Sequence, residues 1–283
     1  MRGRFLCGVL TGLVLMAQGG RAGSPELALA LGREGQHRLA ALEYRRLALA
    51  TNEALAAGRW HWLAAHEYAQ EKAWDLSGPM LDRAEDHAPD DLAGPVAWLR
   101  AEQALAERDW ATAAFYFESL HGAAGREDPL WRDFAARGAA AACLRAGRLD
   151  AARAAAPDEA RAAIDGYAAR RDKKPWLGGC LGLVPGLGYL YAGETGNAIR
   201  SLLLNGIFLW GMVETAEEDL WGPFAVLAFA EFTWYSGSIY GGLDAVHRQN
   251  AGRLDAAVEA VRGERRPRVR TDTIPLFSLG FEF

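Results

Sequence analysis

The chain has 283 residues, enough for two modest domains, and a formal net charge of −5 at neutral pH. A nucleic-acid-binding domain usually concentrates Lys and Arg on one face, so the acidic balance gives no support for nucleic acid as a partner. The three cysteines form no CxxC pair and no Cys/His cluster, which argues against a zinc site and against a disulfide framework. We therefore expect no metal and no cofactor.

Residues 1–22 have the layout of a secretory signal peptide. Arg2 and Arg4 form a charged end, residues 5–17 form a short apolar core, and Gly20 and Ala22 are the small residues that a signal peptidase reads. The core is too short to span a bilayer comfortably. We predict that the chain is exported, with an uncleaved anchor as the alternative.

Residues 25–171 are predicted to be helical, because they are rich in Ala, Leu, Glu and Arg and repeat apolar residues at three- and four-residue spacing. A unit recurs there with spacings of 37, 36 and 39 residues. Each copy begins with a small or polar residue, and an anchor residue follows two positions later. A small residue comes three positions after the anchor, and an apolar residue four positions after the small one. The copies are Gly35, His37, Ala40 and Tyr44; Lys72, Trp74, Ser77 and Leu81; Arg108, Trp110, Ala113 and Phe117; and Gly147, Leu149, Ala152 and Ala156.

This pattern resembles the tetratricopeptide repeat, a helix pair of about 34 residues, over roughly residues 25–160. The Leu-Gly pair typical of its first helix is absent. The resemblance implies a solenoid over residues 23–170 whose concave surface binds a peptide or a protein. First-helix side chains would line that surface, with packing as the alternative for each: His61, His66, Trp98 and Gln103. An irregular Ala-rich helical domain is the alternative for the region as a whole.

Residues 175–250 are predicted to form a membrane domain, which makes the fold all-α: a helical-repeat solenoid followed by a transmembrane hairpin. The spans are placed at 198–213 and 220–241, about 24 and 33 Å long as helices, joined by the acidic residues 214–219. The Gly-rich residues 176–192 suit a re-entrant or interfacial segment. A buried helical hairpin in a soluble protein is the alternative.

Residues 185–193 include Pro185, Gly186, Gly188, Tyr191 and Gly193. They resemble the Pro-Gly-x-Gly-x-x-Tyr-x-Gly signature of small two-span membrane domains, although a Tyr stands where that family commonly has Gln. The resemblance covers about 60 residues and implies an architecture rather than a reaction. Physically, the glycines permit a tight turn and close backbone packing, and the tyrosine suits the headgroup level.

Glu231 stands out because a carboxylate within an apolar segment is costly and should face a partner or water. Arg200 is the first candidate partner and Asn205 the second. A structural ion pair and a role in transport or proton handling are both open. Further on, Asp244 and His247 lie three residues apart, so we expect a hydrogen bond at a helix end; two ligands are too few for a metal.

The tail, residues 251–283, ends in alternating apolar residues that resemble the closing strand of an outer-membrane β-barrel. Such an ending suits strand addition to another envelope protein. A hairpin would leave this tail on the same side as the repeats. Three crossings would place the basic residues 262–270 in the cytoplasm, and the positive-inside rule conflicts with an exported hairpin.

We therefore expect a non-enzymatic scaffold or adaptor of the bacterial cell envelope, serving assembly, secretion or polysaccharide export. It would sit at the inner membrane with its repeats in the periplasm, contacting lipid and envelope proteins. The alternative is a small translocation component that uses Glu231 and Arg200. No nucleophile–base pair, phosphate loop or metal cluster suggests an enzyme.

Overall fold

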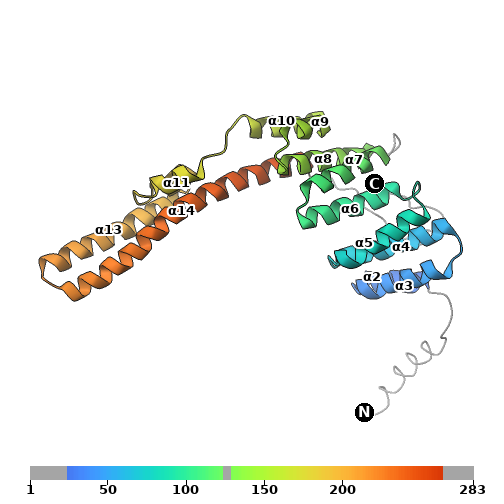
Figure 1. Ribbon diagram of the computed structural model, residues 1–283, viewed down its shortest axis with the longest axis horizontal. Helices are drawn as coiled ribbons and strands as arrows, with labels where there is room; N and C mark the ends of the chain where they lie inside the picture. The colour runs from blue at the N-terminus through green and yellow to red at the C-terminus, as the bar shows by residue number, and fades with distance from the viewer. Residues whose placement is uncertain (1–23, 124–128, 264–283) are drawn as a thin grey trace, which may run out of the picture. The chain divides into compact units, whose positions relative to one another are not determined.

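The computed structural model describes residues 24–123 and 129–263, and every regular element in these ranges is an α-helix (Figure 1). The predicted all-α class is therefore confirmed. The described residues divide into two compact units, 24–157 and Asp158–Gly263. The proposed signal peptide and the strand-like end of the tail lie outside the described residues.

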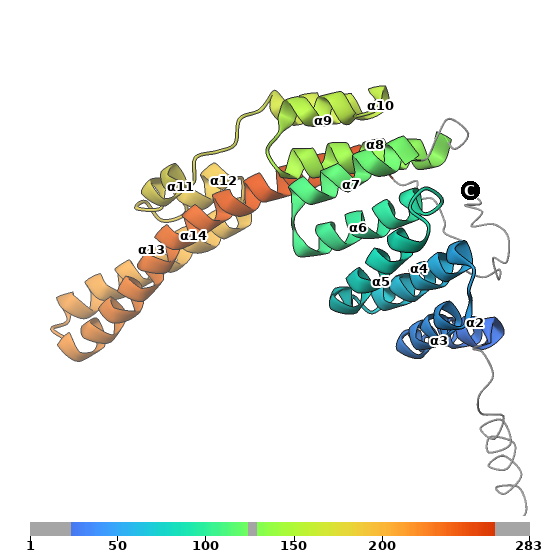
Figure 2. The same ribbon diagram turned by 45° about the vertical axis from the view of Figure 1, so that its right-hand side comes forward.

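The first unit consists of four helix pairs, each joined by a short turn (Figure 2). The pairs are α2 (Pro25–Arg33) with α3 (His37–Ala50), α4 (Ala54–Gln70) with α5 (Trp74–His87), α6 (Ala93–Glu107) with α7 (Trp110–Ala123), and α8 (Pro129–Arg145) with α9 (Leu149–Ala155). Consecutive pairing of this kind is compatible with a helical-repeat fold.

The turn inside each pair has the same backbone geometry. Its residue is left-handed in all four copies, with φ of 76° at Gly35, 58° at Lys72, 60° at Arg108 and 73° at Gly147. The N–H of the residue after the left-handed one donates a hydrogen bond to the carbonyl five residues earlier, as Ala73 N does to Tyr68 O at 3.0 Å. This pattern is the Schellman motif, which ends the first helix of each pair. The recurring first position of the sequence unit is thus the turn, and the anchor two residues on begins the second helix.

The third position of the unit is fully buried in every copy, namely Ala40, Ser77, Ala113 and Ala152. A small side chain is needed there because the second helix lies close to its partner. The only polar member, Ser77, donates a hydrogen bond to Ala65 O at 3.0 Å. The residue four positions later is buried as well, so each second helix presents one inward face.

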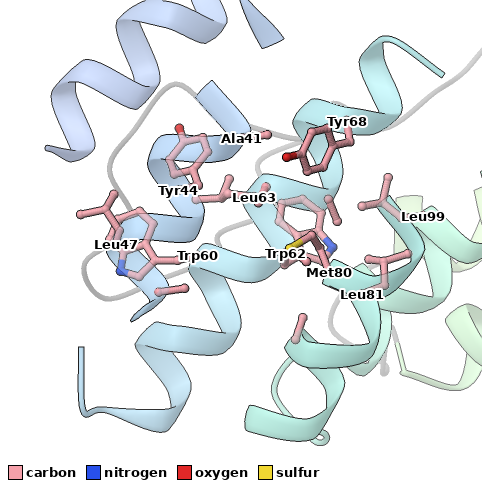
Figure 3. Close-up of a cluster of buried hydrophobic side chains, with 14 of the residues drawn as sticks. Ala41, Tyr44, Leu47, Trp60, Trp62, Leu63, Tyr68, Met80, Leu81 and Leu99 are labelled. Atoms are coloured by element: carbon pink, nitrogen blue, oxygen red, sulfur yellow. The ribbon is translucent and has the colours of Figure 1, made fainter. Parts of the chain in front are cut away.

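The core of the first pairs combines aromatic residues of the first helices with aliphatic residues of both helices (Figure 3). Trp62 of α4 lies 6.3 Å from Trp98 of α6 between ring centroids, and Trp98 lies 5.9 Å from Trp131 of α8. A buried aromatic contributes about 1.5–3 kcal/mol through the apolar area that it removes from water. Trp62 and Trp98 occupy the same position of the unit, ten residues before the turn, whereas Trp131 lies sixteen residues before its turn. The rings therefore join consecutive pairs, but not through a single repeated position.

The second unit is organised along its longest helix. Its elements are α10 (Asp158–Ala168), α11 (Pro175–Leu181), α12 (Leu187–Ala192), α13 (Thr195–Glu217) and α14 (Trp221–Arg262). At 42 residues α14 is about 63 Å long, and each of the other four packs on it. Arg253 of α14 holds the segment after α10 by donating to Tyr167 O at 3.1 Å and Arg170 O at 2.7 Å.

The membrane prediction needs correction at the level of the spans. None of the helices among the described residues is both long enough and apolar enough to cross a bilayer. The expected spans at 198–213 and 220–241 lie within α13 and α14, where Arg200, Asn205 and Glu231 interrupt the apolar residues. The expected re-entrant segment is two short helices, α11 and α12, and α14 runs on into the residues assigned to the tail.

Candidate functional site

The Pro-Gly-x-Gly segment makes the turn that enters α12. Gly186 caps this helix with φ of 89°, and a Cβ there would lie 2.5 Å from Ala198 O. Gly193 ends the same helix with φ of 92°. Both positions need glycine because the left-handed conformation is costly for a residue with a side chain.

Gly188, the second glycine of the signature, is required because neighbouring backbones leave no room for a side chain. A Cβ at this position would lie 2.5 Å from Gly178 O in α11 and 2.9 Å from Gly242 Cα in α14. Gly178 and Gly242 approach one another equally closely, since a Cβ on Gly178 would lie 2.7 Å from Gly242 O. Three helices therefore meet backbone to backbone at three glycines. We call these residues, Gly178, Gly188 and Gly242, the glycine junction.

Tyr191, the aromatic member of the signature, secures the approach to α11. Its hydroxyl accepts a hydrogen bond from Lys174 N at 3.2 Å, and Lys173 Nζ lies 5.7 Å from its ring centroid. Pro185 stands in the turn between α11 and α12. The signature residues thus pack α12 against α11, α13 and α14, and the expected headgroup position of the tyrosine remains a prediction.

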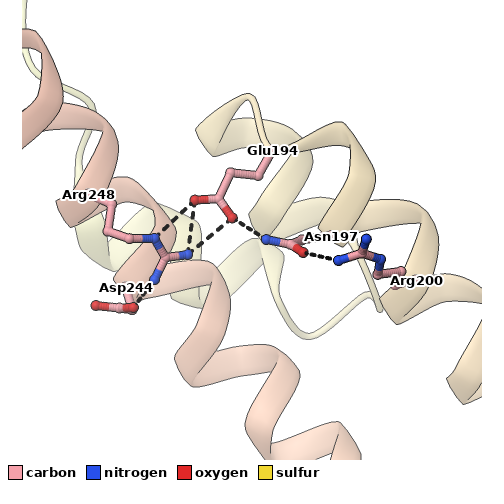
Figure 4. A network of polar contacts seen from close by, with 5 residues as sticks. All are labelled: Glu194, Asn197, Arg200, Asp244 and Arg248. Carbon is pink, nitrogen blue, oxygen red and sulfur yellow. Dashed lines mark hydrogen bonds and ion pairs between the residues drawn. The ribbon is translucent and has the colours of Figure 1, made fainter.

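A polar network lies next to the glycine junction, between the start of α13 and the middle of α14 (Figure 4). Arg248 donates to both carboxylate oxygens of Glu194, at 2.9 and 3.1 Å from Nη2, and its Nη1 bonds Asp244. Asn197 Nδ2 donates to Glu194 Oε2 at 2.6 Å. Burial acts to raise the pKa of Glu194, but the hydrogen bonds from Asn197 and Arg248 outweigh it and hold the pKa below its usual value.

Asp244 therefore bonds Arg248, one helical turn away, while His247 lies exposed on the same helix. The expected contact between Asp244 and His247 is replaced by an i,i+4 ion pair. Across the described ranges, no group of three or more His, Cys, Asp or Glu side chains is placed to hold a metal ion.

A cavity of about 470 Å³ opens beside this network, between α12, α13 and α14. Its lining includes Arg200, Ser201, Trp234, Ser238, Asp244 and Arg248. Ser201 and Ser238 share a hydrogen bond of 2.8 Å between their hydroxyl oxygens, which fixes the two helices against each other. Arg200 donates to Asn197 Oδ1 at 3.4 Å, at the long limit of a hydrogen bond.

Glu231 is buried, but the structure does not bring Arg200 to it. Its Oε2 has no hydrogen-bond partner within the described residues, and neither does the Oδ1 of buried Asn205. Asn205 Nδ2 donates instead to Ser201 O at 2.6 Å in its own helix. The bond of Ser201 to Ser238 sets Arg200 opposite residue 239, eight residues from Glu231, which is about 12 Å along α14.

The hairpin of α13 and α14 has an apolar exterior. The exposed large apolar side chains are Ile199, Leu202, Leu203, Ile207, Leu209, Trp210 and Val213 on α13, and Trp221, Val226, Phe229, Phe232, Trp234 and Tyr240 on α14. At about 100° per residue they cover an arc of roughly 160° on α13 and roughly 200° on α14. An amphipathic surface helix would keep such residues on its inner side. We call this set the apolar belt.

The side chains expected to line the concave surface of the repeats are mainly buried in the core of the first unit. His61 is buried and stacks on His87 at 5.7 Å, and His66 is buried between Trp62 and Trp98. Burial lowers the pKa of each histidine to about 4, with smaller effects from neighbouring basic groups. Both are therefore neutral near pH 7 and belong to the packing. Gln103 donates to Glu107 at 2.9 Å on the same helix.

No protein-family model matches the chain, and no curated protein or solved structure is significantly similar to it. Function is therefore argued from the chain's own features.

Proposed function

We propose that this protein is a non-enzymatic scaffold or adaptor. Its helical pairs would bind a partner protein, and the α13–α14 hairpin would attach it to a lipid bilayer. The observation that carries this proposal is the apolar belt, which lies on the outward faces of both helices. Contiguous apolar surface on this scale marks a site that contacts another apolar phase.

The side chains of the belt expose much of their surface, with Phe229 75% exposed and Trp210 69%. Completely burying one such side chain is worth about 1.5–3 kcal/mol, and the belt residues are 46–75% exposed, so covering all thirteen provides about 12–24 kcal/mol. That equals or exceeds the net stability of an ordinary domain, and a bilayer supplies the required environment on all sides of a hairpin.

Lipid is favoured over a protein partner by what borders the belt. Trp210, Trp221 and Trp234 are exposed, and tryptophan is enriched where hydrocarbon meets water. The segment before α11 carries the basic run 170–174, which suits the charged surface of a membrane. This arrangement supports attachment by the hairpin, with the glycine junction at its base.

For the first unit we propose a tetratricopeptide-like solenoid. Its support is the repeated turn and the buried small residue, which recur with one register, together with ring-to-ring contacts between consecutive pairs. Solenoids of helix pairs present extended surfaces to proteins. We place the partner in the bacterial cell envelope and the repeats on the periplasmic side of the inner membrane, on the strength of the predicted signal peptide.

Vesicle flotation of the full chain tests the attachment. Ile207→Glu and Phe229→Glu place carboxylates on exposed belt positions, so each should leave the fold intact but reduce flotation with phosphatidylcholine vesicles about tenfold. The matched control is Leu49→Glu on α3, because Leu49 is 77% exposed and lies in the other unit. Equal flotation of all four proteins would refute lipid attachment by the hairpin.

A second candidate function, a translocation component, has one supporting observation: the buried, unpartnered oxygen of Glu231. Glu231→Gln keeps the size of the side chain and removes the ionisable group. A scaffold should retain its crosslinked partners in cells with this variant. Loss of an exported product at normal protein level would favour translocation instead.

A further inference from the structure

We propose that the cavity between α12, α13 and α14 binds the phosphodiester group of a phospholipid, with Arg200 as its cationic ligand. The inference rests on the proposed lipid attachment and adds to it a defined site with one chemical class of ligand.

The two guanidinium groups of the cavity have very different partners. Arg248 uses Nε and Nη2 on Glu194, at 2.9 to 3.1 Å, and Nη1 on Asp244. Arg200 makes only the 3.4 Å bond to Asn197, and it forms no ion pair with a carboxylate within the part of the chain that the structure describes. Its N–H groups are therefore available to a ligand that supplies anionic oxygens.

The remaining lining fits the same chemistry. Two guanidinium groups lie on the cavity wall, but Arg248 is bonded by the carboxylates of Glu194 and Asp244. Arg200 is therefore the cationic group of the wall that remains for an anion. Ser201 and Ser238 add hydroxyl groups beside Arg200. Arginine binds phosphate oxygens through parallel N–H donors, in a stronger contact than neutral hydrogen bonds give.

The position of the cavity favours a lipid over free phosphate. Arg200 lies between exposed Ile199 and the exposed pair Leu202 and Leu203 on α13, so the cationic group stands at the border of the apolar belt. Trp234 belongs both to the lining and to the belt. A phospholipid joins a phosphodiester to hydrocarbon chains, so one molecule satisfies both surfaces. The volume lies within the ordinary range for small-ligand sites.

Native mass spectrometry of the full chain in a maltoside detergent, with phosphatidylglycerol added, tests the site. Wild type should retain one lipid, and Arg200→Gln should weaken retention about tenfold, the usual cost of losing a charged hydrogen bond. Arg200→Lys should lie between the two. Arg161→Gln is the matched control, because it removes one exposed positive charge from the same unit, outside both the cavity and the basic run 170–174.

Two results would overturn the proposal. Equal retention by wild type and Arg200→Gln would exclude Arg200 as the ligand. Displacement of the lipid by equimolar inorganic phosphate or glycerol phosphate would show a site for free phosphate instead. Neither result bears on the attachment of the hairpin to lipid, which is refuted if Ile207→Glu and Phe229→Glu both float as wild type does.

Discussion

The glycine junction makes the strongest quantitative prediction. In Gly188→Ala the new methyl carbon would lie 2.5 Å from Gly178 O, 2.9 Å from Gly242 Cα and 3.2 Å from Gly182 N. All three are backbone atoms, so none can rotate away and a helix has to move. Overpacking of this kind costs about 3 kcal/mol at its upper end, and the better helix propensity of Ala returns about 1 kcal/mol. We expect a net loss of about 2 kcal/mol.

The matched control is Gly252→Ala, also within a helix. A Cβ at Gly252 meets no atom within 4 Å, so only the propensity gain of about 1 kcal/mol remains. Amide hydrogen exchange of the full chain, read by mass spectrometry on peptides from α11 and α12, reports the free energy of local opening in this unit. Gly188→Ala should lower it and Gly252→Ala should not. Equal protection in both variants would refute the close approach of the three backbones.

Two further predictions concern the first unit. Gly138→Ala would place a methyl group 2.5 Å from the Phe117 ring, so the thermal midpoint of that unit should fall by several degrees, and an unchanged midpoint would contradict the packing. Burial lowers the pKa of His61 and His66 to about 4, from a value near 6.5 in the unfolded chain. The folded protein is therefore most stable above pH 6.5. As the pH falls from 6.5 to 4, each histidine lowers the free energy of unfolding by up to about 1.4 kcal/mol per pH unit. The urea midpoint at pH 7 and pH 5 measures this, and replacing both histidines by Gln should flatten the dependence.

The repeat unit was readable from the sequence because its signals are local. The turn, the anchor that begins the second helix and the small buried residue lie within six positions, as in Lys72, Trp74 and Ser77. Backbone geometry of this kind depends little on the rest of the fold. The inward orientation of His61 and His66 was harder to predict, because it depends on how neighbouring pairs pack.

The candidate site depends on contacts that the sequence hides. Glu194 and Arg248 are 54 residues apart, and no periodicity links them. The signature residues indicated close backbone packing, but no sequence pattern predicts that Gly188 meets both Gly178 and Gly242. The apolar content of residues 198–241 indicated a helical hairpin and led us to expect two membrane spans. None of the described helices is long and apolar enough to be such a span. Composition alone does not separate an apolar helix from a crossing one.

The expected pairing of Arg200 with Glu231 failed because the loop of the hairpin was misplaced. Residues 214–219 were expected to be the loop, but glutamate is a good helix former and α13 continues to Glu217. The observed loop is centred about two and a half residues later than the expected one. In an antiparallel hairpin this offset doubles, so each residue of α13 faces a residue of α14 about five positions further on, which is more than one helical turn. The expected loop would set Arg200 opposite residue 233, near Glu231, whereas the bond between Ser201 and Ser238 sets it opposite residue 239. That shift leaves Glu231 without a cation among the described residues and leaves Arg200 on the wall of the cavity.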